Sequence, residues 1–506
     1  MNKFEGFSAV QLLQLLETKE VSSKEVMQYF IDRIEAVNPS LNAVVIKLYD
    51  AALKKAEEAD NMLLQGKRMG KLHGLPFTIK ECLDLPCTPS TLGLMRRMND
   101  FPEKTDAYVD ALQQEGGIIL GKTNVAQLLM YFESCNPVYG VTNNPHSAAH
   151  TCGGSSGGEG AIIAAGGSPV GIGTDIGGSL RIPAAFCGIC SIKPTMSRTI
   201  DLTRFIENQV NPSINSVTGV LGNYAEDLQL FLEIMNNVAG KQRLVDPLQD
   251  FRNIDLSKLK IGYFLSDGIF EPMPAIKRAV LEAVGKLRAM GMEVIEFEPP
   301  ALSEAEELFF RILSADNGPL FTDNLQKEKA MPQVKGLIML SKCSPLIRSI
   351  LFRLTGLLGQ QSVKRIIPYF GGHGETNQKE MTAWQHAYIE RYLSAMNNTG
   401  IGNLDAIISP VCALPAFLHN TADKVGLGGT YTLQHNVTGF PSGVATISKV
   451  KPEEAVGRKT TSDGLVKTAS RIEASSAGLP LSVQIAARPW NEHIVLAIIN
   501  QLHERG

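Results

Sequence analysis

The chain has 506 residues, with 48 basic and 51 acidic side chains and a net charge of −3. Its apolar share of 44% excludes a disordered chain and is enough for a large core. The near-neutral charge argues against a nucleic-acid partner, because nucleic-acid-binding proteins usually carry a clear basic excess. The eight cysteines are too sparse for a disulfide framework and suit a reducing, intracellular compartment.

The N-terminus has no apolar segment after a basic start, so no signal peptide is expected. The chain also has no run of about 18 uninterrupted apolar residues, so no membrane-spanning helix is expected. Both features favour a protein that is soluble or peripheral to a membrane.

Hydrophobic periodicity predicts alternating helices and strands. In chain order these are helices near 8–18 and 22–37, a strand near 41–48, a helix near 50–66, a strand near 75–80, a helix near 105–115, strands near 117–122 and 261–265, a helix near 274–290, strands near 293–297, 404–408 and 479–485, and a helix near 489–503. Ser22 and Glu25 fit a capping box at the start of the second helix. The alternation predicts an α/β fold with a largely buried sheet. No linker divides the chain, so residues 1–506 are expected to form a single domain.

Residues 153–191 are rich in glycine, serine and alanine and poor in charge. A flexible linker does not carry bulky apolar residues such as Ile162, Ile172 and Phe186 among its glycines, so a buried loop system is expected. Within it, Ser155 and Ser179 lie beside runs of glycine. Amides in such runs are able to converge on an anion, as an oxyanion hole requires. From spacing alone, this interpretation and a plain tight turn with incidental serines are equally open.

Three other chemistries have little support. Gly171, Gly173 and Gly177 give G-x-G-x-x-x-G, which departs from the dinucleotide-binding fingerprint. Cys187 and Cys190 form a C-x-x-C, but they follow an apolar run and lack a second pair, so buried structural cysteines are expected. The nine histidines form no cluster typical of a metal or catalytic site, so neither a metal nor another cofactor is expected.

Several long motifs resemble the amidase signature family, over most of the chain. They are G-L-P-F-T-I-K-E at 74–81, G-K-T-N at 121–124, G-G-S-S-G-G at 153–158, G-T-D-I-G-G-S-L-R-I-P at 173–183 and K-P-T at 193–195. Within the family, S-C-N-P at 134–137, Glu159 and G-L-P-L-S-V-Q at 478–484 look most like the fatty acid amide hydrolases. The resemblance implies the amidase signature fold, a central twisted mixed β-sheet covered by many α-helices.

The family's Ser–cis-Ser–Lys triad, carried onto this sequence, implies Ser179 as the nucleophile, Ser155 as the bridging serine and Lys80 as the base. The Gly154–Ser155 peptide is then expected to be cis, with Ser156 as an accessory hydrogen-bonding residue. The implied oxyanion hole consists of the backbone amides of Ile176, Gly177, Gly178 and Ser179. The sequence departs from the family's usual residues, outside the triad, at Cys152, Ser191, Val220 and Asn223.

A lysine base must be neutral near pH 7, and burial lowers a lysine pKa by up to about 3–5 units. Lys80 follows an apolar run, which predicts such a setting. Glu81 is expected to face away from Lys80, because neighbours on a strand point to opposite faces. Asp175 and Arg181, on either side of Ser179, are expected to form a buried ion pair that holds the loop rather than to touch substrate.

Residues 330–374 carry a charge of +6 with no acidic residue, and the rest of the chain carries −9. The segment is also rich in leucine and isoleucine, and Pro345 is expected to split it into two short helices. Basic, leucine-rich helices bind membrane interfaces and favour anionic lipids. A core helix pair or a dimer contact is the alternative. The resemblance implies a helical cap that contacts a membrane surface through 334–358, beside an acyl pocket lined by Leu129, Met130, Tyr131 and Phe132.

The function that the resemblance implies is a serine amidase. It would hydrolyse lipid amides (N-acyl ethanolamines or primary fatty amides) to fatty acid and amine through an acyl-enzyme. Three alternatives are weighed against it: the amidase subunit of a tRNA-dependent amidotransferase, a general small-amide amidase, and a catalytically silent lipid-binding protein. Whether the chain forms a homodimer is left open.

Overall fold

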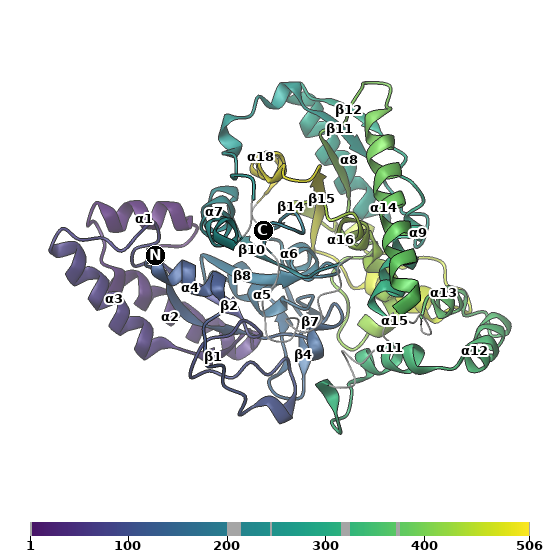
Figure 1. Ribbon diagram of the computed structural model, residues 1–506, viewed down its shortest axis with the longest axis horizontal. Helices are drawn as coiled ribbons and strands as arrows, with labels where there is room; N and C mark the ends of the chain where they lie inside the picture. The colour runs from purple at the N-terminus through teal and green to yellow at the C-terminus, as the bar shows by residue number, and fades with distance from the viewer. Residues whose placement is uncertain (1–2, 200–213, 243–244, 315–323, 371–374, 505–506) are drawn as a thin grey trace.

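The computed structural model describes residues 3–199, 214–242, 245–314, 324–370 and 375–504. Its centre is a sheet of 11 strands, and strands from the two halves of the chain meet in it (Figure 1). In spatial order the strands are β1 (Val44–Lys47), β3 (Ile118–Thr123), β2 (Pro76–Lys80), β8 (Val170–Asp175), β10 (Val217–Gly222), β9 (Cys190–Lys193), β14 (Ser442–Lys449), β15 (Pro480–Ala487), β13 (Ala406–Pro410), β11 (Lys260–Tyr263) and β12 (Glu293–Glu296).

The sheet is mixed. Strand β2 runs parallel to both β3 and β8, and β11 runs parallel to both β12 and β13. The other neighbouring strands pair antiparallel. Every residue of β2, β3, β8 and β15 is buried, as expected for strands covered on both faces. The predicted α/β class and mixed sheet are confirmed.

The N-terminal helices are α1 (Ala9–Glu17), α2 (Ser23–Leu41) and α3 (Tyr49–Leu64). The capping box that starts α2 is present, since the Ser22 hydroxyl accepts from the Glu25 amide and the Glu25 carboxylate accepts from the Ser22 amide. The expected end of this helix near residue 37 is wrong, because the helix continues through Pro39. It ends only where Asn42 adopts a left-handed conformation with φ 53°.

The remaining predicted elements lie close to their expected positions. The helices are α4 (Ala107–Gln114), α8 (Pro274–Ala289) and α18 (Glu492–Leu502). Helices α8 and α18 pack on β14 and β15, beside α7 (Ala225–Gln242), which covers β10. Figure 1 shows the long helix α14 (Glu375–Asn397) beside α9 (Leu302–Leu313), close to the short helix α16 (Leu433–Val437).

The segment over residues 153–191 is buried, as predicted, but it is not a loop system. It contains the helices α5 (Gly157–Ala164) and α6 (Arg181–Cys187) around the strand β8, and then β9. Both helices are short and buried on all sides, so the sequence shows no amphipathic period there. Small residues on α5 and α6 let the two helices and the sheet approach closely.

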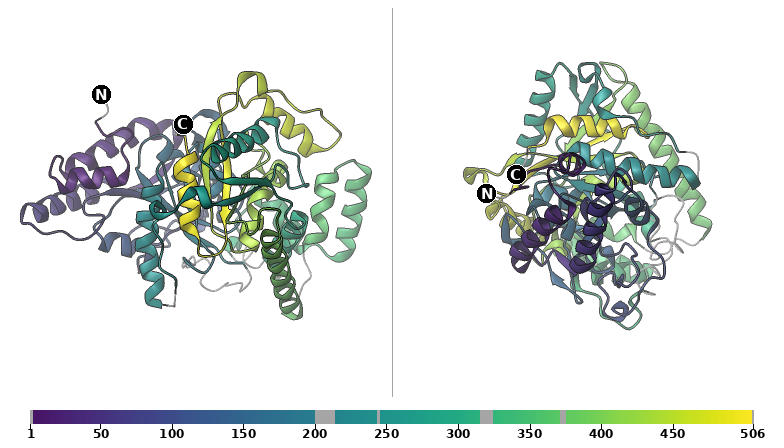
Figure 2. Two further views of the ribbon diagram at one scale, coloured as in Figure 1. Left: turned by 90° about the horizontal axis from the view of Figure 1, so that it is seen from above. Right: turned by 90° about the vertical axis from the view of Figure 1, so that its left-hand side faces the viewer.

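The segment over residues 330–374 forms α11 (Pro332–Lys342), α12 (Pro345–Leu357) and α13 (Gln361–Ile366); its last residues, 371–374, lie outside the described part. Pro345 begins α12, so the predicted break is at the expected residue, but the expected number of two helices is wrong, because a left-handed Gly359 with φ 70° separates α12 from a third helix, α13. Helices α11 to α13 stand at the periphery of the molecule (Figures 1 and 2). Within the described ranges, no helix combines the length and the apolar character needed to cross a membrane.

Candidate active site

The three side chains of the expected triad come from separate elements that meet at one edge of the sheet. Lys80 is the last residue of β2, and Ser179 follows the neighbouring strand β8. Because β2 and β8 run parallel, their carboxyl ends lie at the same edge. Ser155 lies in the turn between β7 (Ser147–Thr151) and α5. The fold therefore brings Lys80 into hydrogen-bonding contact with Ser155, which is 75 positions away in the sequence, and with Thr174, which is 94 positions away.

The Lys80 side chain is fully buried and directed at Ser155. Its Nζ lies 2.8 Å from Ser155 Oγ, 2.9 Å from Thr174 Oγ1 and 3.4 Å from the Thr174 carbonyl oxygen. Glu81 lies elsewhere, because its carboxylate accepts from the amide of Thr91 at 2.5 Å and from that of Leu92 at 3.1 Å. The expected separation of Glu81 from Lys80 is thus found.

Ser155 follows a glycine that nothing larger could replace. The Gly154–Ser155 peptide bond is cis. A Cβ on Gly154 would lie 2.6 Å from the Tyr131 carbonyl oxygen and 2.8 Å from the Glu133 nitrogen, closer than such contacts occur. The loop that carries Tyr131 and Glu133 is therefore packed directly against the turn that carries Ser155.

The Ser179 side chain is 7% exposed and faces a cavity, whereas Ser155 is 1% exposed. The turns of the two serines are joined by a bond from the Ser156 amide to the Ser179 carbonyl oxygen at 3.2 Å. The Ser156 hydroxyl donates to the Thr174 carbonyl at 3.3 Å. Within the part of the chain that the structure describes, no hydrogen bond joins the hydroxyls of Ser155 and Ser179. Catalytic hydrogen bonds commonly form or tighten only when substrate is bound.

Asp175 and Arg181 form a fully buried ion pair below Ser179. The guanidinium contacts the carboxylate through two nitrogens, at 2.9 and 3.0 Å. Burial raises the pKa of Asp175, but the charge and hydrogen bonds of Arg181, helped by Lys193 and Asn436, together outweigh burial and hold this pKa below its usual range. The carboxylate also accepts from the amides of Gly178 and Leu180, so it fixes the turn on both sides of the serine.

These contacts change the expectation for the oxyanion hole at one position. The Gly178 amide donates to Asp175 at 2.8 Å and is directed into the turn. Ile176, Gly177 and Ser179 line the cavity, and the role of their amides in an oxyanion hole stays a prediction. The physical reason for the difference is that a buried carboxylate needs several donors, and the nearest amides supply them.

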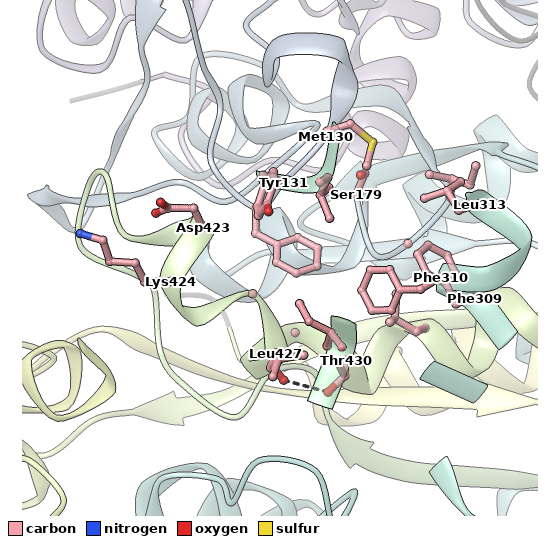
Figure 3. Close-up of a pocket in the computed structure, with 18 of the residues that line it drawn as sticks. Met130, Tyr131, Ser179, Phe309, Phe310, Leu313, Asp423, Lys424, Leu427 and Thr430 are labelled. Atoms are coloured by element: carbon pink, nitrogen blue, oxygen red, sulfur yellow. Dashed lines mark hydrogen bonds between the residues drawn. The ribbon is translucent and has the colours of Figure 1, made fainter. Parts of the chain in front are cut away.

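The cavity beside Ser179 is lined mainly by apolar side chains (Figure 3). Most of them come from the loop before Glu133, from α9, from α11 and α13, and from the region around α16. They are Leu129, Met130, Tyr131, Phe132, Phe309, Phe310, Leu313, Leu337, Ile366, Leu427, Leu433 and Leu465. The four residues expected to line the acyl pocket, Leu129 to Phe132, are all among them. A polar end is provided by Asp423 and Lys424.

The sequence analysis missed several residues of the site. Thr174 contacts Lys80, and its place inside the G-T-D motif is the one signal that could have indicated it. Thr432, Asn436 and Gln484 bind Arg181 from elements more than 250 positions away. Such distant contacts of a buried arginine have no local pattern.

The C-x-x-C pair is away from this chemistry. Cys187 and Cys190 are free thiols and fully buried. Burial raises the pKa of both thiols, so the thiolate that redox or metal chemistry requires is disfavoured.

The chain was compared with protein families, curated proteins and solved structures. The model of the family described as Amidase matches residues 25–496. Fatty acid amide hydrolase 1 of Caenorhabditis elegans is 31% identical over 97% of this chain and 87% of that protein. Fatty-acid amide hydrolase 1 of Sus scrofa is 31% identical over 97% and 84%. The acetamidase of Emericella nidulans is 30% identical over 98% and 88%.

Solved structures agree with the fold. A structure of fatty acid amide hydrolase matches with a TM-score of 0.82 at 24% identity, over 98% of this chain and 85% of that one. A crystal structure of an amidase matches with a TM-score of 0.74 at 22% identity, over 98% and 99%. The chain therefore belongs to the amidase signature family, and it is an amidase.

Proposed function

We propose that the protein hydrolyses lipid amides to a fatty acid and an amine, through an acyl-enzyme on Ser179. The observation that carries this proposal is the apolar cavity that opens on Ser179. A long acyl chain fits side chains of this kind, because its binding gains about 0.8 kcal/mol for each methylene group removed from water. The similarity to fatty acid amide hydrolases over nearly the whole chain supports the same substrate class.

In the proposed mechanism, neutral Lys80 accepts a proton from Ser155, which in turn accepts one from Ser179. Ser179 then attacks the amide carbonyl and forms a tetrahedral adduct. The amides of Ile176, Gly177 and Ser179 are assigned to the oxyanion, and Gly178 is assigned to holding the turn through Asp175. The proton returns through Ser155 to the amine as the C–N bond breaks. Water releases the fatty acid by the same route.

The substrate class is tested with a panel of N-acyl ethanolamines, primary fatty amides, acetamide and glutamine, each assayed as kcat/KM. The long-chain amides are expected to exceed acetamide by at least about 100-fold, because a few buried methylenes already supply that factor. A preference for acetamide would contradict the lipid proposal and favour a general small-amide amidase. Release of ammonia from glutamine, with copurifying partner subunits, would favour the amidotransferase alternative.

We also propose that α11 to α13 form a cap through which the enzyme contacts anionic membranes. None of the side chains of α12 is buried, and its exposed apolar residues include Leu346, Ile350 and Leu357, which are 72%, 50% and 84% exposed. Basic side chains interrupt this apolar surface at Arg348 and Arg353. The cap also borders the cavity through Leu337, Val363 and Ile366, which gives a lipid substrate a short path from membrane to site.

The cap is tested by replacing both arginines of α12 with glutamate, as R348E/R353E, and measuring sedimentation with phosphatidylserine vesicles. Binding is expected to fall by at least about tenfold, because each basic residue near an anionic surface contributes about 1 kcal/mol. R252E/K258E is the matched control, since it makes the same charge change at exposed sites outside the cap and is expected to bind like wild type. Unchanged binding of R348E/R353E would refute the cap.

A further inference from the structure

The mechanism above leaves one buried carboxyl group close to the base unused. Glu159 lies in the first turn of α5 and has no exposed surface. Its Oε2 accepts from the Thr78 hydroxyl at 2.6 Å, and its Oε1 accepts from the Thr123 hydroxyl at 2.9 Å. Both oxygens thus accept a hydrogen bond from a neutral hydroxyl group.

The sheet provides a slot for this carboxyl group. A Cβ on Gly171 would collide with the Glu159 carboxyl, whose Cδ it would approach to 2.8 Å. Gly171 pairs with Thr78 across β8 and β2, so glycine at this position is what admits the side chain. Buried glutamates are rare without a partner or a role, and here the fold makes room for one.

The slot is on the same face of the sheet as the base. Thr78 and Lys80 are two residues apart on β2, and alternate residues of a strand point to the same face. Thr123 pairs directly with Lys80 across β3 and β2. Glu159 is therefore bound by two neighbours of Lys80: Thr78, two residues earlier on β2, and Thr123, its pairing partner on β3.

The electrostatics couple the two groups. Burial raises the pKa of Glu159 to about 8, against the lowering effects of the Thr78 and Thr123 hydroxyls and of the charge of Lys80. Helix α5 packs against α2, α6, β2, β3, β8 and β10. Among the described titratable groups of these elements, Lys80 is the one whose charge acts on Glu159. The ammonium charge of Lys80 therefore favours the carboxylate form of Glu159, and that carboxylate in turn favours the ammonium form of Lys80.

We propose that Glu159 is a positioning residue for Lys80, whose ammonium form it stabilises as a carboxylate, and that it thereby sets the pH range in which Lys80 accepts the proton of the nucleophile. The inference rests on the proposed role of Lys80 as base. It adds that the base acts together with a second buried titratable group, Glu159 of α5, which is bound by the neighbours of Lys80 in the sheet.

The test measures the rate at which a fluorophosphonate labels Ser179 as a function of pH. In wild type the rate is expected to fall at low pH as Lys80 becomes protonated. In Glu159→Gln, which keeps the shape and removes the charge, the midpoint is expected to move to lower pH by about one unit. Glu159→Asp keeps a carboxyl and is expected to move the midpoint less. Thr123→Val removes one donor of the carboxylate and shifts the midpoint in the same direction as glutamine, so it serves if Glu159→Gln does not fold.

Glu473→Gln is the matched control, because Glu473, on α17 (Gly464–Ala474), is a buried carboxylate that pairs with Arg458 and does not line the cavity beside Ser179. Its midpoint is expected to equal that of wild type. Slower labelling of Glu159→Gln at every pH with an unmoved midpoint would overturn the inference, since it would show a purely structural role. Labelling of Lys80→Ala at the wild-type rate would instead refute Lys80 as the base, so the two failures are distinguishable.

Discussion

Replacing Ser179 by alanine is expected to abolish amide hydrolysis, with kcat falling by at least about 10⁴-fold. The reason is that no acyl-enzyme forms without the hydroxyl, and the substitution leaves the cavity and the turn in place. The measurement is the release of amine from the best substrate of the panel, together with mass-spectrometric mapping of fluorophosphonate labelling.

The neighbouring Ser156→Ala is the control for this substitution. Its hydroxyl binds the Thr174 carbonyl and does not line the cavity, so a reduced rate with intact labelling of Ser179 is expected. Full labelling of the Ser179→Ala variant would place the nucleophile elsewhere. That result would contradict the proposed mechanism and would indicate that a different serine is the reactive one.

Replacing Asp175 by asparagine is expected to lower the free energy of unfolding by about 3–5 kcal/mol, because it leaves the charge of Arg181 buried without its counter-ion. The pKa of Asp175 is lowered in the folded protein, so its stabilising contribution is present above the unfolded value of about 3.9 and is lost progressively as the pH falls from there towards the lower folded value. The measurement is the urea midpoint at pH 7 and at about pH 2.5, and the difference between wild type and variant should shrink at the lower pH.

Asp250→Asn provides the comparison for a surface pair. Asp250 contacts Arg252, whose side chain is 66% exposed, and such pairs contribute about 0–1 kcal/mol. An Asp175→Asn variant that unfolds at the wild-type midpoint would show that the turn around Ser179 does not depend on this ion pair. Activity should fall with stability, because the same carboxylate holds the amides of Gly178 and Leu180.

The sequence predicted the elements with a strong hydrophobic period. The β-α-β pattern of residues 260–297 appears as β11, α8 and β12 within a few residues of the expected bounds. The glycine-rich segment was harder, because Gly160 and Ala161 give a helix no amphipathic face. Its helices form through packing against the sheet, and packing between distant strands leaves no trace in a short window of sequence.

For the site, the motifs placed Lys80, Ser155 and Ser179, and the structure brings these residues to one edge of the sheet. The motifs do not show which acceptor each backbone amide binds, so they could not show that the Gly178 amide donates a hydrogen bond to the Asp175 carboxylate. They also gave Glu159 only as a mark of resemblance. Its hydrogen bonds to Thr78 and Thr123, the neighbours of Lys80, depend on the register of β2 and β3, which only the folded sheet defines.

The ion pair under Ser179 has a consequence for biosynthesis. Arg181 donates to the Thr432 carbonyl, the Asn436 side chain and the Gln484 side chain, and all three lie in the last part of the chain to be translated. A nascent polypeptide that has emerged only as far as α14 holds Ser179, Ser155 and Lys80, but not the three C-terminal groups that bind Arg181. These contacts of Arg181 therefore form only after α16 and β15 have been translated and have packed against the rest of the fold.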